Sequence, residues 1–474
     1  MPSSTPSPGG TVPYRGIITV CVMLATLMQA LDSTIANVAL PYMQGGLSAT
    51  QDQATWILTS YIVAAAIMMA PVGYLAGRFG RKNVFLASIT GFTIASVLCG
   101  MAQSLGQIVV FRVLQGIFGA TLVPLSQATM LDIYPPEQRG SAMAVWGMGV
   151  MVGPILGPTL GGWLTNDYSW RWVFYINLPI GILAFLGLLF FMQRDEPGEA
   201  RRFDWLGFGV LSLFLGAFQI MLDRGELKDW FNSGEIITEA VLAGLGLYLF
   251  LVHMATAENP FIPPRLFRDR NMVAALLVMF VVGVVLFATS ALLAPYLQTL
   301  AGYPVFTAGL LMAPRGVGTM VAMLIVGRLT SRVDPRALMA FGILVMCWTL
   351  WEMTGWTPDV DRWGFAFATV LQGFGLGFVF IPLQVVAFAT LDPALRTDGT
   401  AMLSLLRNVG SAIGISACQA LLTRNVQINH SEIVQHVTPL NRAFEQPGVE
   451  QFWNLSTRNG LATLDAEVTR QAQV

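Results

Sequence analysis

The sequence is poor in charge. Asp, Glu, Lys and Arg make up 11% of its 474 residues, whereas soluble globular domains average about 25%. A soluble fold of this length is therefore excluded, because its surface would lack the groups that keep it in water. Lys and Arg number 26 against 27 Asp and Glu, for a net charge of −1. The sequence has no basic face or tail, so nucleic acid is excluded as a partner.

Cysteine and histidine are also scarce. The four cysteines, Cys21, Cys99, Cys347 and Cys418, all lie in apolar segments without metal-site spacing, so we interpret them as small core residues. The sequence lacks an H-E-x-x-H motif, a G-x-S-x-G motif and a Walker loop. We therefore expect no enzyme activity, no cofactor and no metal. Residues 1–15 lack the features of a signal peptide and are predicted to form a disordered cytoplasmic tail.

Long apolar runs dominate instead. Hydrophobic residues make up 54% of the chain, and its mean hydropathy is +0.62. A membrane-spanning helix needs about 20 residues. Thirteen apolar runs are candidate spans, at residues 16–40, 55–76, 84–101, 108–130, 142–164, 173–192, 206–222, 236–255, 273–293, 308–329, 337–351, 364–388 and 402–422. The sequence thus predicts an all-α polytopic membrane protein.

The distribution of Lys and Arg predicts the orientation. With the N-terminus in the cytoplasm, fifteen of these residues fall in inner segments and four in the short outer loops. Because inner loops are rich in positive charge, we expect a multi-pass protein of the bacterial inner membrane with a cytoplasmic N-terminus. Residues 423–474 would then form an external tail or a truncated loop.

An internal repeat predicts how the spans group. Gly73 to Lys82 and Gly327 to Arg336 both read G-x-L-x-x-R-x-x-x-[KR], and V-L-Q-G occurs at Val113 and again at Val370. Matched elements at equivalent spans indicate two halves in parallel orientation. The expected domains are an N-terminal six-helix bundle (16–193), a linker with two extra helices (194–264) and a C-terminal bundle with five visible spans (265–422).

Five motifs in this order resemble the fourteen-span drug:proton antiporters of the major facilitator superfamily, of the EmrB/QacA type. They are Leu31 to Pro41, Gly73 to Lys82, Arg112 to Gly119, Gly149 to Gly162 and Trp170 to Gly181. The chain departs from the family in two ways. Gly77 stands where the second motif usually has Asp, and a fourteenth span is absent from the visible runs.

The resemblance implies a major facilitator fold and proton-coupled efflux of hydrophobic or amphipathic small molecules by alternating access. It also implies a periplasmic membrane-fusion adaptor and an outer-membrane channel as partners. Two other interpretations stay open. One is a proton-coupled exporter of a single metabolite or siderophore, and the other is a membrane receptor that does not transport.

Asp32 is the predicted centre of proton coupling. A carboxylate within a span costs roughly 2.5–3.5 kcal/mol on insertion scales, so it faces a partner or a cavity or carries a proton. Arg112 lies at a similar predicted depth, and pairing with it would keep Asp32 charged. A static structural ion pair is the alternative interpretation.

The other predicted functional residues form three groups. Glycines at every fourth position of the fifth span let a neighbouring helix approach closely, and two prolines favour bending; we assign gating and helix packing to Gly149, Gly153, Pro154, Gly157, Pro158, Gly161 and Gly162. The matched basic loops predict a cytoplasmic latch formed by Gly73, Arg78, Arg81, Lys82, Arg332 and Arg336. Intramembrane polar residues predict a substrate cavity lined by Gln29, Asn37, Gln115, Arg315, Gln372, Arg407 and Asn408.

Overall fold

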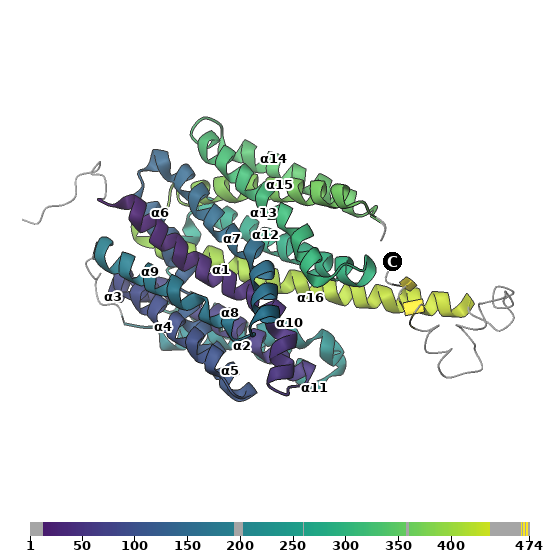
Figure 1. Cartoon of the computed structure of the whole chain (residues 1–474). Coiled ribbons are helices and arrows are strands. Elements are labelled where there is room, and N and C mark those ends of the chain that lie inside the picture. Colours follow the sequence, from purple (N-terminus) through teal and green to yellow (C-terminus); the bar gives the residue numbers. More distant parts are fainter. Residues whose placement is uncertain are drawn as a thin grey trace, which may run out of the picture.

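The computed structural model describes residues 13–193, 202–258, 260–356 and 360–436, together with 466, 468, 469, 471 and 472. Every regular element in these ranges is a helix. The first stretch of the chain forms α1 (Arg15–Gly46), α2 (Gln51–Met69), α3 (Val72–Phe79), α4 (Arg81–Met101), α5 (Leu105–Gly119), α6 (Leu122–Ile133), α7 (Arg139–Asp167), α8 (Trp172–Tyr175) and α9 (Asn177–Phe191). All of them are drawn in purple to blue in Figure 1.

The remaining helices continue the chain through a hairpin and a second bundle. They are α10 (Trp205–Arg224), α11 (Gly234–Thr256), α12 (Arg270–Pro295), α13 (Val305–Leu329), α14 (Pro335–Met353), α15 (Arg362–Ala387) and α16 (Arg396–His436). A short π-helix, Tyr296–Leu300, prolongs α12.

The described helices include twelve or thirteen candidate membrane spans. Twelve are long and apolar enough on their own, and α2 and α3, which are bent by 57° relative to each other, form a thirteenth if they count as one span. The predicted all-helical architecture with thirteen visible spans is therefore confirmed. The residues between 437 and 465, where the tail or truncated loop was predicted, lie outside the described ranges.

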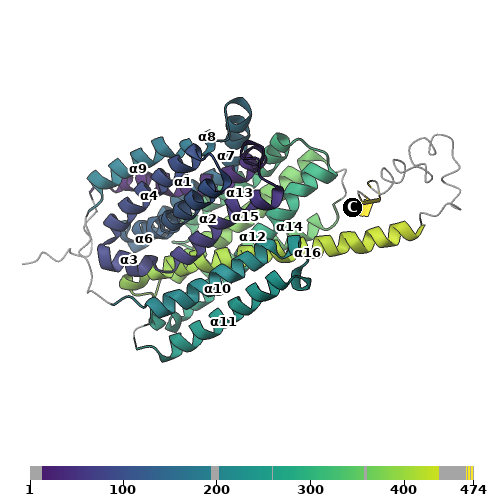
Figure 2. The ribbon, with the colours of Figure 1, turned by 90° about the horizontal axis from the view of Figure 1, so that it is seen from below.

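Two helices run further than their hydropathy predicts. The first apolar run ends at Leu40, before Pro41, yet α1 continues through Pro41 to Gly46. Proline is tolerated in membrane helices because neighbouring groups satisfy the freed backbone carbonyl. Helix α16 continues fourteen residues past the expected end at Leu422, to His436, because this polar stretch contains no glycine or proline to end it. Figure 2 shows this part of α16 running out beyond the bundle.

Helix pairs follow the same pattern in the two bundles. Helix α1 packs against α7 and α2 against α5 in the first bundle, while α12 packs against α16 and α13 against α15 in the second. The hairpin of α10 and α11 lies outside this arrangement and packs on α2 and α16, as Figure 2 shows. The predicted domain boundaries stay a prediction, and part of the linker, residues 194–201, lies outside the described residues.

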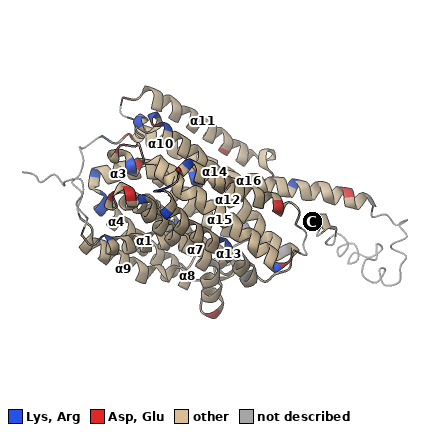
Figure 3. Cartoon of the chain, turned by 90° about the horizontal axis from the view of Figure 1, so that it is seen from above, with Lys and Arg blue, Asp and Glu red and all other residues tan. Residues whose placement is uncertain are grey.

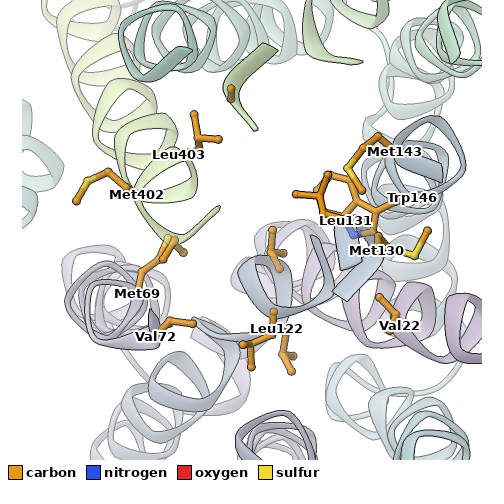
Figure 4. Packing of buried hydrophobic residues seen from close by; sticks show 14 of the residues in the cluster. Val22, Met69, Val72, Leu122, Met130, Leu131, Met143, Trp146, Met402 and Leu403 are labelled. Atoms are coloured by element: carbon orange, nitrogen blue, oxygen red, sulfur yellow. The ribbon is translucent and has the colours of Figure 1, made fainter. Parts of the chain in front are cut away.

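Charged residues gather at the ends of the helices. Figure 3 shows many of the Lys and Arg residues around α3 and α4, with a largely uncharged body beyond them. Helices α4, α7 and α16 begin near this end at Arg81, Arg139 and Arg396, and we call it the arginine end. One apolar core joins side chains of both bundles here, including Met69 and Trp146 of the first and Leu403 of the second (Figure 4).

Candidate functional site

Asp32 of α1 is fully buried, and three donors surround its carboxylate. Arg112 Nη1 lies 2.7 Å from Oδ2, and Gln115 Nε2 lies 2.7 Å from Oδ1. Asn177 Nδ2 also donates to Oδ1, at 3.3 Å. Both carboxylate oxygens of this buried group therefore have hydrogen-bond partners. The expected contact between Asp32 and Arg112 is thus present in the structure, while its role in proton coupling stays a prediction.

The guanidinium of Arg112 is held as tightly as the carboxylate. Its Nε donates to the Ile57 carbonyl at 3.0 Å, and Nη1 also donates to Gln115 Oε1 at 2.8 Å. The guanidinium carbon lies 4.3 Å from the centre of the Tyr61 ring, in cation–π contact. Arg112 is 1% exposed. Since a buried charge without its partner is strongly destabilising, the pair holds α1, α2 and α5 in one arrangement.

Local sequence explains why these groups meet. Arg112 and Gln115 are three residues apart on α5, so both side chains lie on one helix face. Asn177, the first residue of α9, also donates to Ser96 Oγ on α4 at 2.9 Å. We name Asp32, Arg112, Gln115 and Asn177 the Asp32 cluster. The sequence interpretation placed Gln115 in the substrate cavity and quoted Asn177 only within a motif. The sequence could have indicated Asn177, because it is an amide side chain at the start of an apolar segment.

The predicted glycine face of α7 meets α1. A Cβ at Gly153 would lie 2.6 Å from Ala30 Cβ, and one at Gly157 would lie 2.1 Å from Thr34 Oγ1. Gly149 and Gly161 face Met23 and Ile35 of the same helix. Gly162 is different, because a Cβ there would meet nothing within 4 Å. The backbones of two helices can approach this closely only where glycine leaves out the side chain. The side chains of Pro154 and Pro158 lie outside the described part of the structure.

The predicted cavity residues do not form one group. Gln29 Nε2 donates to the Tyr61 hydroxyl at 3.4 Å, and exposed Asn37 donates to the Ser33 carbonyl of its own helix at 3.2 Å. Gln115 belongs to the Asp32 cluster. Gln29 therefore adjoins the Asp32 cluster through Tyr61, which contacts Arg112, whereas Asn37 bonds only within α1 among the described residues.

The second bundle separates its predicted cavity residues in the same way. Arg315 of α13 donates to Ser290 Oγ at 2.7 Å and to the Leu286 carbonyl at 3.2 Å, both on α12. Gln372 is fully buried in α15, and Asn408 Nδ2 lies 3.8 Å from Met69 Sδ of α2. Arg407 faces the junction between the bundles. The cavity assignment of these residues stays a prediction.

The predicted latch residues divide between three environments. Gly73 of α3 lies directly against Asp398 of α16, so a Cβ there would collide with that carboxylate. Arg81 and Arg396 both form ion pairs with Asp132 of α6, which joins the two bundles. Asp132 was not predicted from the sequence. Its position as an acidic residue at the inner end of a span could have indicated it.

The other predicted latch residues have different surroundings. Lys82 Nζ donates to the Leu189 carbonyl at 2.7 Å and to the Met192 carbonyl, so it caps α9 within the first bundle. Arg78, Arg332 and Arg336 are exposed and form no ion pair with any described residue. Their latch role stays a prediction.

Comparison with known proteins agrees with this architecture. Residues 22–415 match the family model of the Major Facilitator Superfamily. The chain belongs to this superfamily. It is therefore a secondary transporter of the membrane and not an enzyme, and the predicted resemblance is confirmed.

Relatives from several bacteria cover most of the chain. Multidrug export protein EmrB of Escherichia coli K12 is 37% identical over 428 residues, which cover 90% of this chain and 83% of the relative. Fatty acid resistance protein FarB of Neisseria gonorrhoeae is 35% identical over 430 residues, covering 90% of this chain and 85% of the relative. This superfamily chain is thus similar along most of its length to proteins of the EmrB type.

Solved structures support the fold at lower identity. The proton:xylose symporter XylE superposes with a TM-score of 0.62 at 14% identity, covering 98% of this chain and 95% of the symporter. The human organic anion transporter MFSD10 superposes with a TM-score of 0.61 at 16% identity, covering 85% and 93%. Identities this low establish the major facilitator fold and nothing about substrate.

Proposed function

We propose that the protein exports hydrophobic or amphipathic small molecules across the bacterial inner membrane in exchange for protons, by alternating access. The arginine end faces the cytoplasm in this proposal, together with the N-terminus. The names of its relatives support export, since EmrB is a multidrug export protein and FarB a fatty acid resistance protein. The Asp32 cluster carries the proton part, because a fully buried carboxylate with an ion-pair partner can exist in two charge states.

Protonation of Asp32 would reach the contact between the bundles through a short chain of packed groups. A neutral carboxyl no longer attracts Arg112, which loosens α1 from α5. Ala30, two residues before Asp32, lies against Gly153 of α7. Helix α7 in turn packs on α13 of the second bundle, where Ile155 contacts Gly316. A change of charge at Asp32 can therefore bias how the two bundles meet.

Contacts at the arginine end support a conformation closed on the cytoplasmic side. Ser141 Oγ of α7 donates to the Gly327 carbonyl of α13 at 3.2 Å. Thr400 Oγ1 of α16 donates to the Pro124 carbonyl of α6 at 3.1 Å. Asp132 adds its ion pair with Arg396. In the proposed cycle the charged Asp32 cluster coexists with this closed end, and protonation precedes its opening.

Transport in proteoliposomes with an acid lumen tests the proposal. Dye uptake coupled to proton release from the lumen is measured for the wild type, for Asp32→Asn and for Asp361→Asn. Asparagine keeps the shape of Asp32 without a titratable proton, so we expect proton-driven uptake to fall to background. Asp361 is exposed before α15, and its variant controls for loss of a carboxylate elsewhere. Full proton-driven uptake by Asp32→Asn would show that Asp32 does not couple transport.

The range of exported compounds is tested by a separate efflux measurement. Efflux of a panel of unrelated compounds from a drug-sensitive host distinguishes a broad exporter from an exporter of one metabolite or siderophore. The adaptor and the outer-membrane channel stay predictions of the resemblance. Residues 437–465, most of the tail that would reach such a partner, lie outside the described ranges.

A further inference from the structure

A narrow pocket lies where the two bundles meet, separate from the Asp32 cluster. The first bundle contributes Gln127 of α6 and Trp146 of α7. The second bundle contributes Met279, Phe380, Gln384, Leu403, Ser404 and Arg407. Figure 4 shows Trp146 and Leu403 on opposite sides of this junction. We call it the Arg407 pocket, and in this conformation it is too narrow to admit a water molecule.

Three polar atoms in the Arg407 pocket lack a protein partner. Gln127 Nε2, Gln384 Oε1 and Arg407 Nε are all buried, and none has a hydrogen bond to another described residue. Gln127 is 2% exposed and Gln384 is 1% exposed. Buried polar groups in folded proteins almost always have partners, so each exception requires an explanation. Three exceptions that line one pocket, on helices from both bundles, indicate a site for a ligand.

The positive charge of Arg407 determines which charge a ligand of the pocket should carry. Arg407 is the charged residue among those that line it, and it forms no ion pair with any described Asp or Glu. Asp132 of α6, which lies outside the pocket lining, is paired with Arg81 and Arg396. A desolvated guanidinium without a carboxylate favours an anion, and the amide N–H of Gln127 adds a second donor.

The aromatic side chains that line the pocket indicate an apolar ligand. Trp146 and Phe380 stack with ring centres 6.2 Å apart and planes 11° apart. The indole N–H of Trp146 is used within the first bundle, where it donates to Ser126 Oγ at 2.9 Å. The two rings therefore form an apolar wall beside Arg407, which suits a ligand with an aromatic or aliphatic body.

We propose that the Arg407 pocket binds the anionic head group of an exported amphiphile, such as an aryl sulfonate or a carboxylate. Arg407 and Gln127 donate to the anionic oxygens, and the Gln384 oxygen accepts from an N–H or O–H group of the ligand. The pocket is closed in this conformation, so the ligand enters when the bundles separate at the arginine end. This inference rests on the proposed export function and specifies its substrate class.

Equilibrium binding of two matched probes tests the substrate class. Anilinonaphthalene sulfonate carries one negative charge, and phenylnaphthylamine is the same ring system without the sulfonate. Binding of both radiolabelled probes to the full-length protein in nanodiscs is measured at neutral pH without a proton gradient. Since a hydrogen bond to a charged group is worth about 1.5–3 kcal/mol, we expect the wild type to prefer the sulfonate by about tenfold or more.

Variants identify the residues responsible for the preference. Arg407→Gln should remove the preference for the sulfonate, and Arg407→Lys should retain part of it. Gln127→Leu should weaken sulfonate binding severalfold and leave phenylnaphthylamine binding unchanged, so the test does not depend on one variant folding. Arg362→Gln removes an exposed cation at the start of α15 and should keep the wild-type preference.

Two results would overturn the inference. One is equal affinity of the wild type for both probes, and the other is an undiminished preference for the sulfonate in well-folded Arg407→Gln. Failure of the proposed export function is a different result. In that case wild-type proteoliposomes show no proton-linked transport, while binding in nanodiscs still discriminates the sulfonate through Arg407.

Discussion

Replacing Gly153 by alanine would test the packing of α7 on α1, on which the proposed coupling depends. The added Cβ would lie 2.6 Å from Ala30 Cβ and 2.7 Å from the Ala30 carbonyl carbon. Apolar carbon atoms prefer separations of about 3.5–4.0 Å. The helices must therefore move apart by about 1 Å, because one of the atoms in the way is backbone and cannot rotate aside.

The expected energy follows from two opposing terms. Overpacking a well-packed site costs about 1–3 kcal/mol, while alanine is favoured over glycine inside a helix by about 1 kcal/mol. We expect a net loss of about 1 kcal/mol in the free energy of unfolding for Gly153→Ala. Reversible unfolding of the purified protein in mixed micelles, followed by circular dichroism, measures this quantity.

Gly162→Ala is the matched control on the same helix. A Cβ at Gly162 meets nothing within 4 Å, so this variant should gain up to about 1 kcal/mol from helix propensity alone. The two alanine variants should then differ by about 2 kcal/mol. If Gly153→Ala proves as stable as Gly162→Ala, the close approach of α1 and α7 at Ala30 is wrong, and with it the proposed path from Asp32 to the second bundle.

Two further predictions concern the arginine end and the start of α10. Asp132→Asn removes the carboxylate that pairs with both Arg81 and Arg396. We expect faster thiol labelling of a cysteine introduced at buried Thr400, which contacts Pro124 of the other bundle, and unchanged labelling would contradict a latch at Asp132. Although burial alone would raise it, the pKa of Asp204 is lowered by donors from Gly207, His253 and Phe261. Since a lowered pKa contributes stability above the unfolded value of about 3.9 and loses it as the pH falls through the folded pKa, Asp204→Asn should lower the stability at pH 7 and leave it unchanged in strong acid. A pH titration of thermal unfolding measures this, and an equal loss at both pH extremes would refute it.

Much of the fold could be predicted because hydropathy and glycine spacing act along one helix at a time. The thirteen spans follow from the length of the apolar runs, and the contact between Asp32 and Arg112 follows from their equal depth in the membrane. The glycine face from Gly149 to Gly161 follows from its period of four residues. Each of these inferences needs the direction of a helix and no knowledge of its neighbours.

The remaining contacts depend on how each helix is rotated against its neighbours. Gln115 and Gln372 occupy matched positions in the repeat, and nothing in the sequence separates a role beside Asp32 from a role in a cavity. Gln127 and Gln384 became visible only because both bundles bring them to one pocket. Asp132 was missed for the same reason, since its two cationic partners come from different bundles.

A comparison of the two bundles explains why the proposed coupling lies in the first one alone. Gly410 follows Gly153 at the same offset that relates Gln372 to Gln115, and it packs against Phe280 as Gly153 packs against Ala30. Val282, two residues after Phe280, therefore takes the place of Asp32, and it is buried among apolar side chains.

Arg112 is replaced in the same way. Thr369 stands at its equivalent position in α15, and its hydroxyl donates to the Phe365 carbonyl of its own helix at 3.0 Å. Gln372 is consequently fully buried, and neither its amide nitrogen nor its oxygen has a partner among the described residues, whereas the equivalent Gln115 bonds to both Asp32 and Arg112. The repeat has thus kept the amide and lost the two charges that satisfied it. The position equivalent to the Asp32 cluster in the second bundle therefore holds no charged side chain, which is consistent with the proposed coupling through the first bundle and its contact with α7.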